Sequence, residues 1–148
     1  MLDSTGKLFT LEISPHRFEY KAIENNFSIQ TNHYQNMLMN ASDISINAQY
    51  PEKKGLTELA GKRIKESSEQ RFDRLFDLCG TKIQFHEADL KNYFRDHNSN
   101  GFPNDNTLCR HGELYETSAS VLIKPLQREI QVALGSPCEA EYKTYQLI

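Results

Sequence analysis

The stretch "LTELAGKRIKESSEQRFDRLFDLCG", residues 56–80, carries the strongest periodic signal in the chain. The apolar residues of its second half recur at the spacing of one helix face, at Phe72, Leu75, Phe76 and Cys79. Gly80 predicts the C-terminal end of this helix. Further apolar residues in the first half indicate that the helix begins near residue 56, although Gly61 lowers the stability of a helix there by about 1 kcal/mol relative to alanine.

A shorter helix is predicted for "HEADLKNYFRDH", residues 86–97. Glu87 and Asp89 suit its N-terminal end, because the helix dipole is positive there. The expected apolar side consists of Ala88, Leu90, Tyr93 and Phe94.

Strands are predicted before the helices. "KLFTLEI" (7–13) and "RFEYKAI" (17–23) alternate apolar and polar residues and predict a β-hairpin. Ser14 and Pro15 supply the turn between them. The alternation of Phe27 and Ile29 predicts a further strand over 27–32. The polar stretch from residue 33 to residue 55 predicts a surface excursion.

A second hairpin is predicted after the helices, from "SASVLI" (118–123) and "EIQVAL" (129–134), and residues 98–107 read as a loop. The order is therefore strands, two helices, strands. This order favours an α+β fold with a largely antiparallel sheet over alternating βαβ units.

The bulk properties indicate one globular domain spanning residues 1–148. The net charge is -3 and the basic residues are scattered, so a nucleic-acid partner is not expected. No apolar run is long enough to cross a membrane, and the start of the chain lacks the apolar core of a signal peptide. Three cysteines at wide spacings fit reduced thiols and a cytoplasmic location.

The cysteines and histidines are candidates for metal binding and for thiol chemistry. Their spacing fits no compact zinc pattern, which usually shows two close pairs. Cys109 and His111 also pair a thiol with a base, and Arg110 lies between them. Because neighbouring side chains of an extended segment point to opposite faces, Arg110 would face away from both. We expect ordinary packing here and no metal or cofactor; the plausible ligands considered are Cys79, His86, His97, Cys109 and His111.

A set of short motifs occurs in an order that resembles a known enzyme family. They are "TNH" (31–33), "SEQRFDRL" (68–75), "ADLKNYFRDH" (88–97), "LCRH" (108–111), "SASVLI" (118–123) and "GSPCEAEY" (135–142). Together they resemble the C-terminal part of the acyl-coenzyme A:6-aminopenicillanic acid acyltransferase-like hydrolases, which are N-terminal-nucleophile (Ntn) amidohydrolases and include carcinine hydrolases. The resemblance covers nearly the whole chain.

The resemblance implies a fold and a chemistry. The fold would be part of an αββα sandwich, and the substrate would be a small amide or thioester. An N-terminal cysteine, exposed by self-cleavage, would attack the carbonyl. Asn32 matches the residue that donates its side-chain amide to the oxyanion, and Arg110 matches an arginine of the active-site region. His33 lies in the same motif and is expected to contact substrate or to bond to backbone.

The resemblance also implies a missing group, because none of the three cysteines matches the nucleophile position. We therefore expect an enzyme portion that is inactive alone: a fragment, a truncated gene product, or a subunit completed in trans by an upstream polypeptide. Two alternatives stay open. The chain could be a catalytically inactive module that binds small molecules, or its polar positions could be structural only.

Overall fold

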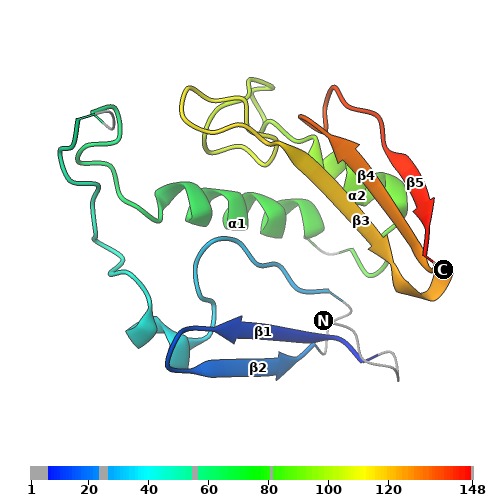
Figure 1. Cartoon of the computed structure of the whole chain (residues 1–148), viewed down its shortest axis with the longest axis horizontal. Coiled ribbons are helices and arrows are strands. Elements are labelled where there is room, and N and C mark those ends of the chain that lie inside the picture. Colours follow the sequence, from blue (N-terminus) through cyan, green and yellow to red (C-terminus); the bar gives the residue numbers. More distant parts are fainter. Residues whose placement is uncertain (1–6, 24–26, 55–56, 81, 148) are drawn as a thin grey trace. The chain divides into compact units, whose positions relative to one another are not determined.

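The computed structural model describes residues 7–23, 27–54, 57–80 and 82–147. It divides into two compact units, Met1–Phe76 and Asp77–Ile148, each with its own antiparallel sheet (Figure 1). The single domain expected from the sequence stays a prediction. Among the described ranges, no helix combines the length and the apolar character needed to cross a bilayer.

The first unit begins with the predicted hairpin. β1 (Phe9–Ile13) pairs antiparallel with β2 (Phe18–Ala22). Ser14 closes the turn: its N–H donates to the Arg17 carbonyl at 2.7 Å, and its Oγ accepts from the Arg17 N–H at 3.1 Å. The turn chemistry inferred from Ser14 is therefore confirmed.

The strand predicted over residues 27–32 is wrong. The backbone there forms only an isolated bridge between Thr31 and His33. The reason is that both side chains bond to Ser68 of the helix that follows, so this segment pairs with a helix and not with a sheet. The polar stretch beyond it contains a 3-10 helix, η1 (Met37–Ser42), whose Met39 is fully buried.

The helix α1 spans Glu66–Cys79, so the predicted helix exists but starts later than expected. Gly61 has φ +77, which no right-handed helix accommodates, and residues 57–65 form turns, a bend and isolated bridges. Gly80, at φ +45, ends the helix as predicted. Phe76 is 60% exposed, which corrects its expected place in the core. Leu56 lies outside the described residues.

The second unit combines a helix with a three-stranded sheet. The helix α2 (Glu87–Phe94) matches the shorter predicted helix, and the Asp89 carboxylate accepts the His86 N–H at 3.0 Å at its N-terminus. β3 (Ala119–Lys124) pairs antiparallel with β4 (Glu129–Leu134) across the 3-10 turn η2 (Pro125–Gln127). β5 (Lys143–Gln146) adds to β4 and was not predicted. All of its residues are exposed, so it lacks the alternation that marks a half-buried strand.

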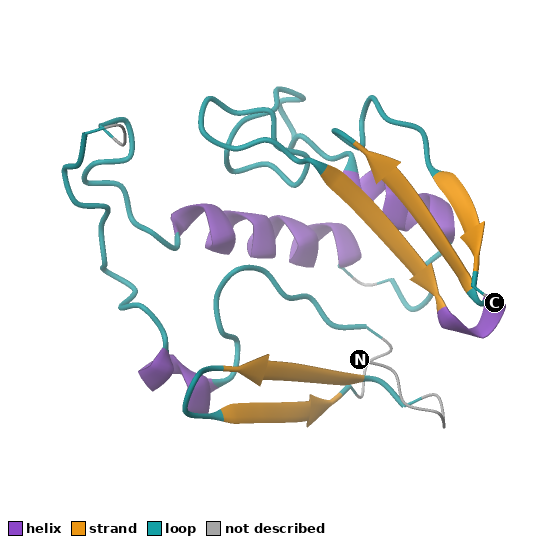
Figure 2. Ribbon diagram, in the orientation of Figure 1, coloured by secondary structure: helices purple, strands orange, loops and turns teal. Residues whose placement is uncertain are grey.

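The helix α2 covers one face of this sheet, as Figure 2 shows. Lys124 lies on the same face as the buried Leu122, and its Nζ bonds to Glu87 of α2 at 2.7 Å. The opposite face exposes apolar side chains, including Val121 at 47% and Ile123 at 62%. The α+β class with antiparallel sheets is thus confirmed, with one apolar sheet face exposed in the described chain.

Candidate functional site

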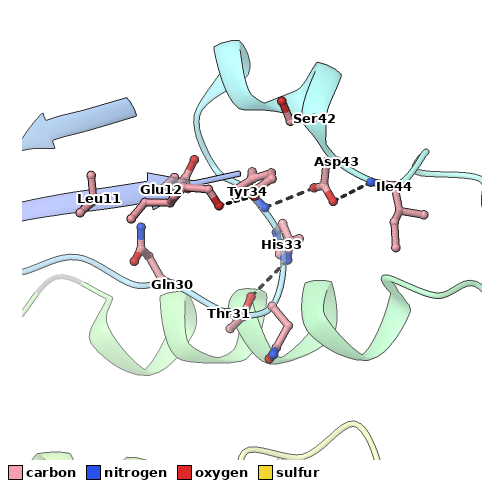
Figure 3. A pocket seen from close by; sticks show the side chains of 11 residues that line it. Leu11, Glu12, Gln30, Thr31, His33, Tyr34, Ser42, Asp43 and Ile44 are labelled. Atoms are coloured by element: carbon pink, nitrogen blue, oxygen red, sulfur yellow. Dashed lines mark hydrogen bonds between the residues drawn. The ribbon is translucent and has the colours of Figure 1, made fainter. Parts of the chain in front are cut away.

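A cavity of about 410 Å³ lies in the first unit, where the end of β1 meets residues 30–34 and 42–44 (Figure 3). Both residues of the first motif expected to carry function, Asn32 and His33, line it. The other lining residues are Leu11, Glu12, Ile13, Gln30, Thr31, Tyr34, Ser42, Asp43 and Ile44. Residues 30–34, the polar end of the segment that begins at Phe27, therefore form part of the cavity wall.

The carboxylate of Glu12 fixes this segment to β1. Its two oxygens accept the backbone N–H groups of Gln35 at 2.6 Å and Asn36 at 3.0 Å. Glu12 is only 9% exposed, and bonds from N–H groups to an ionised carboxylate are among the stronger hydrogen bonds in proteins. A buried acid on the strand thus holds the loop that carries Asn32 and His33.

His33 is held by hydrogen bonds on both ring nitrogens. Its Nδ1 lies 2.8 Å from Ser68 Oγ, and Gln35 Nε2 lies 2.6 Å from its Nε2. Ser68 Oγ donates to Thr31 Oγ1 at 3.1 Å, and Thr31 Oγ1 donates to the Ser68 carbonyl at 3.0 Å. Thr31 Oγ1 also lies 3.2 Å from His33 Nδ1, so two hydroxyl groups contact this nitrogen. Figure 3 shows Thr31 and His33 facing each other.

Asn32 is oriented by Arg71 of α1. Arg71 Nη2 lies 3.0 Å from Asn32 Oδ1. A guanidinium has only donors, so the carboxamide oxygen must face Arg71 and the NH₂ group must point elsewhere. Asn32 is exposed and lines the cavity. The geometry therefore presents an amide donor on a side chain held by Arg71, which is the group that the family resemblance implies for an oxyanion site.

An ion pair braces the other wall of the cavity. Asp43 Oδ2 lies 2.7 Å from Lys65 Nζ, with both side chains 13% exposed, and also accepts the Tyr34 N–H at 3.3 Å. Burial alone would raise the pKa of Asp43. The Lys65 ammonium and the N–H groups of Ile44 and Tyr34 outweigh burial and hold this pKa below its usual value. Asp43 is thus an ionised structural group that joins residue 34 to the start of α1.

Arg110 belongs to the second unit. Its backbone belongs to a short hairpin over residues 110–117, called the Arg110 hairpin below. The Arg110 N–H donates to Thr117 Oγ1 and the Arg110 carbonyl accepts the Thr117 N–H, each at 2.9 Å. Its guanidinium carbon lies 5.1 Å from the Tyr115 ring centroid, a cation–π contact. The structure brings Asn32 and His33 together in one cavity. The meeting of Asn32 with Arg110 stays a prediction, since each lies in a different unit.

The second unit gathers cysteine and histidine side chains that local spacing did not pair. The group consists of His97, Cys109, His111 and Cys138, whose ligand atoms all lie within 4.8 Å of one another. The sequence predicts the first three as plausible metal ligands. It does not predict Cys138, because only the fold brings Cys138 close to the other three. Cys79 and His86 are not part of the group. Burial raises the pKa of the Cys109 thiol to about 11.

Comparisons of the chain with family models, with curated proteins and with solved structures find no match. The family resemblance drawn from the motif order therefore stays a hypothesis.

Proposed function

We propose that this chain supplies the oxyanion-stabilising and substrate-binding portion of a cysteine-nucleophile amide hydrolase or acyltransferase. The reaction would cleave a small linear amide or thioester, or transfer its acyl group. The single observation that carries the proposal is the Asn32 carboxamide, held at the cavity by Arg71 with its NH₂ group directed away from the guanidinium.

The chemistry fits this arrangement. When a nucleophile attacks an amide carbonyl, negative charge develops on the carbonyl oxygen, and a preoriented N–H donor stabilises it. Orientation matters because a donor that is already fixed needs no rearrangement during the reaction. The cavity volume of about 410 Å³ falls within the range of small-molecule sites. Asn32 would donate to the oxyanion, and His33 would line the substrate pocket.

The nucleophile would come from another polypeptide stretch. Cys109 is fully buried and Cys79 is 7% exposed, so neither sulfur is accessible to a substrate. Cys138 Sγ lies 3.0 Å from His111, inside the cysteine and histidine group. A reactive cysteine needs a partly exposed, electropositive environment, which Cys79 and Cys109 lack. Cys138 is not among the residues that line the cavity with Asn32.

The exposed face of the β3–β4–β5 sheet supports the same proposal. Val121, Ile123 and Leu134 are 47%, 62% and 77% exposed on strands that carry α2 on the other face. In an αββα sandwich a second sheet would pack on such a face, about 10 Å away. One helix layer and one sheet layer are half of that architecture.

The alternative is a catalytically inactive module that binds small molecules. It is favoured by the satisfied state of His33, whose ring nitrogens both have partners, so no free base lies beside Asn32. Such a module would bind an amide or a carboxylate at the cavity and release it unchanged.

The test is a turnover assay on the full chain, alone and combined with the polypeptide encoded immediately upstream. The substrates are small N-acyl amides and thioesters. We expect turnover by the combination only, and Asn32→Ala should lower kcat by roughly 10²–10³-fold. Asn47→Ala, at an exposed asparagine outside the cavity, is the matched control and should leave kcat unchanged.

Two results would contradict the proposal. Equal kcat for Asn32→Ala and the parent would remove the oxyanion role. Binding without turnover, read from shifts of the Asn32 side-chain NH₂ resonances on adding the amides or their acid products, would support the binding module.

A further inference from the structure

The cysteine and histidine group of the second unit is drawn from three separate segments. His97 follows α2, Cys109 and His111 flank Arg110 at the start of the Arg110 hairpin, and Cys138 lies in the turn after β4. His111 Nε2 is 3.0 Å from Cys138 Sγ and 3.4 Å from Cys109 Sγ. One imidazole nitrogen is therefore close to two sulfur atoms.

These separations are those of atoms arranged around one ion. Zinc bonds to sulfur at about 2.3 Å and to histidine nitrogen at about 2.0–2.1 Å, so a tetrahedral site places nitrogen and sulfur ligands roughly 3.5 Å apart. The two His111 contacts are close to this separation, and no pair of ligand atoms in the group exceeds 4.8 Å.

His97 gives an independent indication that a cation binds at this site. Its Nε2 is buried and has no hydrogen-bond partner among the described residues, while its ring packs edge-on against His111 with centroids 5.3 Å apart. A buried ring nitrogen without a partner is unfavourable, and such groups in native structures call for an explanation. A bound cation would give this nitrogen its partner.

The backbone beside three of the four ligands, His97, Cys109 and Cys138, is already held in place. The Cys109 N–H donates to the Asp96 carbonyl at 3.1 Å, which joins the residue before His97 to the Arg110 hairpin. Arg95 Nε donates to the Pro137 carbonyl at 2.8 Å, which joins the end of α2 to the residue before Cys138. Thr107 Oγ1, which is buried, donates to the Cys109 carbonyl at 2.6 Å. The site is therefore built on a fixed frame and needs only small movements of the ligand side chains.

We propose that His97, Cys109, His111 and Cys138 bind one zinc ion. Two thiolates and two imidazoles form the Cys₂His₂ set that tetrahedral zinc prefers, and the two thiolate charges neutralise the ion. Four protein ligands leave no open position, so the ion is structural and takes no direct part in a reaction. Binding forms two Zn–S bonds and releases the two thiol protons to solvent.

The ion would also fix Arg110, because Cys109 and His111 are its two chain neighbours. Anchoring both neighbours restricts the arginine backbone to one conformation. The zinc site itself does not rest on the proposed enzymatic function, since its residues lie outside the Asn32 cavity.

The experiment is a titration of the full chain, reduced and freed of metal, with Zn²⁺ in competition with a chromophoric chelator. We expect one equivalent per chain. Replacement of zinc by Co²⁺ should give the intense visible bands of a tetrahedral ion and a sulfur-to-cobalt charge-transfer band. Cys138→Ser should lose about half of the charge-transfer intensity and weaken affinity by more than the roughly 10–100-fold that loss of a supporting partner causes. Cys79→Ser is the matched control, since Cys79 is also buried and lies outside the group.

Zinc binding is also measured on the unmutated chain, so this part of the test does not depend on whether a variant folds. His97→Gln provides a second variant, with circular dichroism to check that each variant is folded before titration. Failure of the reduced parent to bind zinc, or full binding by both folded variants, would overturn the proposal. A Cys109–Cys138 disulfide in the purified chain, with no zinc uptake after its reduction, would overturn it as well.

Discussion

At the scale of single residues, Ser68 is the point on which the candidate site depends most. It is 4% exposed, and its hydroxyl contacts His33 Nδ1 and Thr31 Oγ1 while its carbonyl accepts from Thr31. One helical residue thus holds both neighbours of Asn32. A short hydroxyl side chain reaches two partners here because residues 31–33 lie directly against α1.

Ser68→Ala should lower the free energy of unfolding by about 1–3 kcal/mol, because it removes a hydroxyl that bonds to both His33 Nδ1 and Thr31 Oγ1. Urea denaturation followed by circular dichroism measures the change. Ser28→Ala, at an exposed serine, should change it by no more than about 0.5 kcal/mol. Equal effects of the two substitutions would mean that the Ser68 bonds contribute nothing.

The sequence could place Asn32 and His33 at the mouth of a polar site, because an apolar alternation stops just before them. It could not reveal Arg71 and Glu12 as the groups that hold the segment. Arg71 is 39 residues from Asn32 and Glu12 is 23 from Gln35, so each partner is chosen by the fold and not by local pattern. The sequence could not reveal the contact between Cys138 and His111 for the same reason, because these residues are 27 positions apart.

At the scale of elements, Glu87 joins α2 to the sheet. Its carboxylate bonds to Lys124 of β3 at 2.7 Å and to Lys91 of its own helix at 2.6 Å. These hydrogen bonds, Lys124 first and then Lys91, lower the pKa of Glu87 to about 2. An unfolded glutamate titrates near pH 4.3, so the folded state holds this proton less tightly.

A lowered pKa makes the contribution of Glu87 complete above about pH 4–5 and lost as the pH falls towards 2. The Glu87→Gln variant should therefore lose less stability than the parent between pH 5 and pH 2. We expect a difference of at most about 1 kcal/mol, because the Glu87 side chain is 38% exposed and the ion pairs are screened. Denaturation midpoints at each pH measure it, with the exposed Glu141→Gln as control. Parallel curves for the parent and Glu87→Gln would contradict this account.

The Arg110 hairpin depends on Gly112. The Asp105 carboxylate fills the space beside it and accepts the N–H groups of Leu114 and Tyr115 at 3.2 Å and 2.9 Å. A Cβ at residue 112 would collide with that carboxylate and with the Asp105 backbone nitrogen. The close approach, and not the backbone angle, requires glycine here.

Gly112→Ala should therefore lower the free energy of unfolding by about 1–3 kcal/mol, as overpacked sites do. Thermal and urea denaturation measure the loss. Gly101→Ala is the comparison: its Cβ would meet nothing within 4 Å, and only the positive φ of +71 opposes it, at about 1 kcal/mol. A Gly112→Ala variant as stable as the parent would show that the loop moves aside without loss.

The sequence predicted those elements whose pattern is local. The first hairpin and β4 follow from the alternation of apolar and polar residues, and Gly80 ends α1 because a left-handed residue stops a helix. The start of α1 and the strand over 27–32 were predicted wrongly because tertiary bonds decide them. Residues 57–65 bridge back to Gln49 and Tyr50, and residues 31–33 bond to Ser68. β5 carries no apolar alternation at all, so only its pairing with β4 identifies it.

At the scale of the whole molecule, the β3–β4–β5 sheet exposes an apolar face among the described residues. Val121 and Ile123 lie on this face, and their side chains are 47% and 62% exposed. Apolar sheet surface of this kind favours association with another surface. The same face is where the proposed sandwich would receive its second sheet.

Ile123→Lys should reduce self-association of the isolated chain at high concentration, because a charge on the face opposes its burial. Sedimentation velocity across a concentration series measures the effect. Leu126→Lys is the matched control, since Leu126 is 87% exposed on η2 and lies outside the strands. Equal association of both variants and the parent would show that the sheet face is not the surface involved.

The most direct test of the central claim is kcat of the completed enzyme for the parent, Asn32→Ala and the control Asn47→Ala. Asn32 is the proposed donor to the oxyanion, whereas Asn47 is exposed and lies outside the cavity. We predict that Asn32→Ala lowers kcat by roughly 10²–10³-fold and that Asn47→Ala leaves it unchanged. A kcat for Asn32→Ala equal to that of the parent would contradict the account.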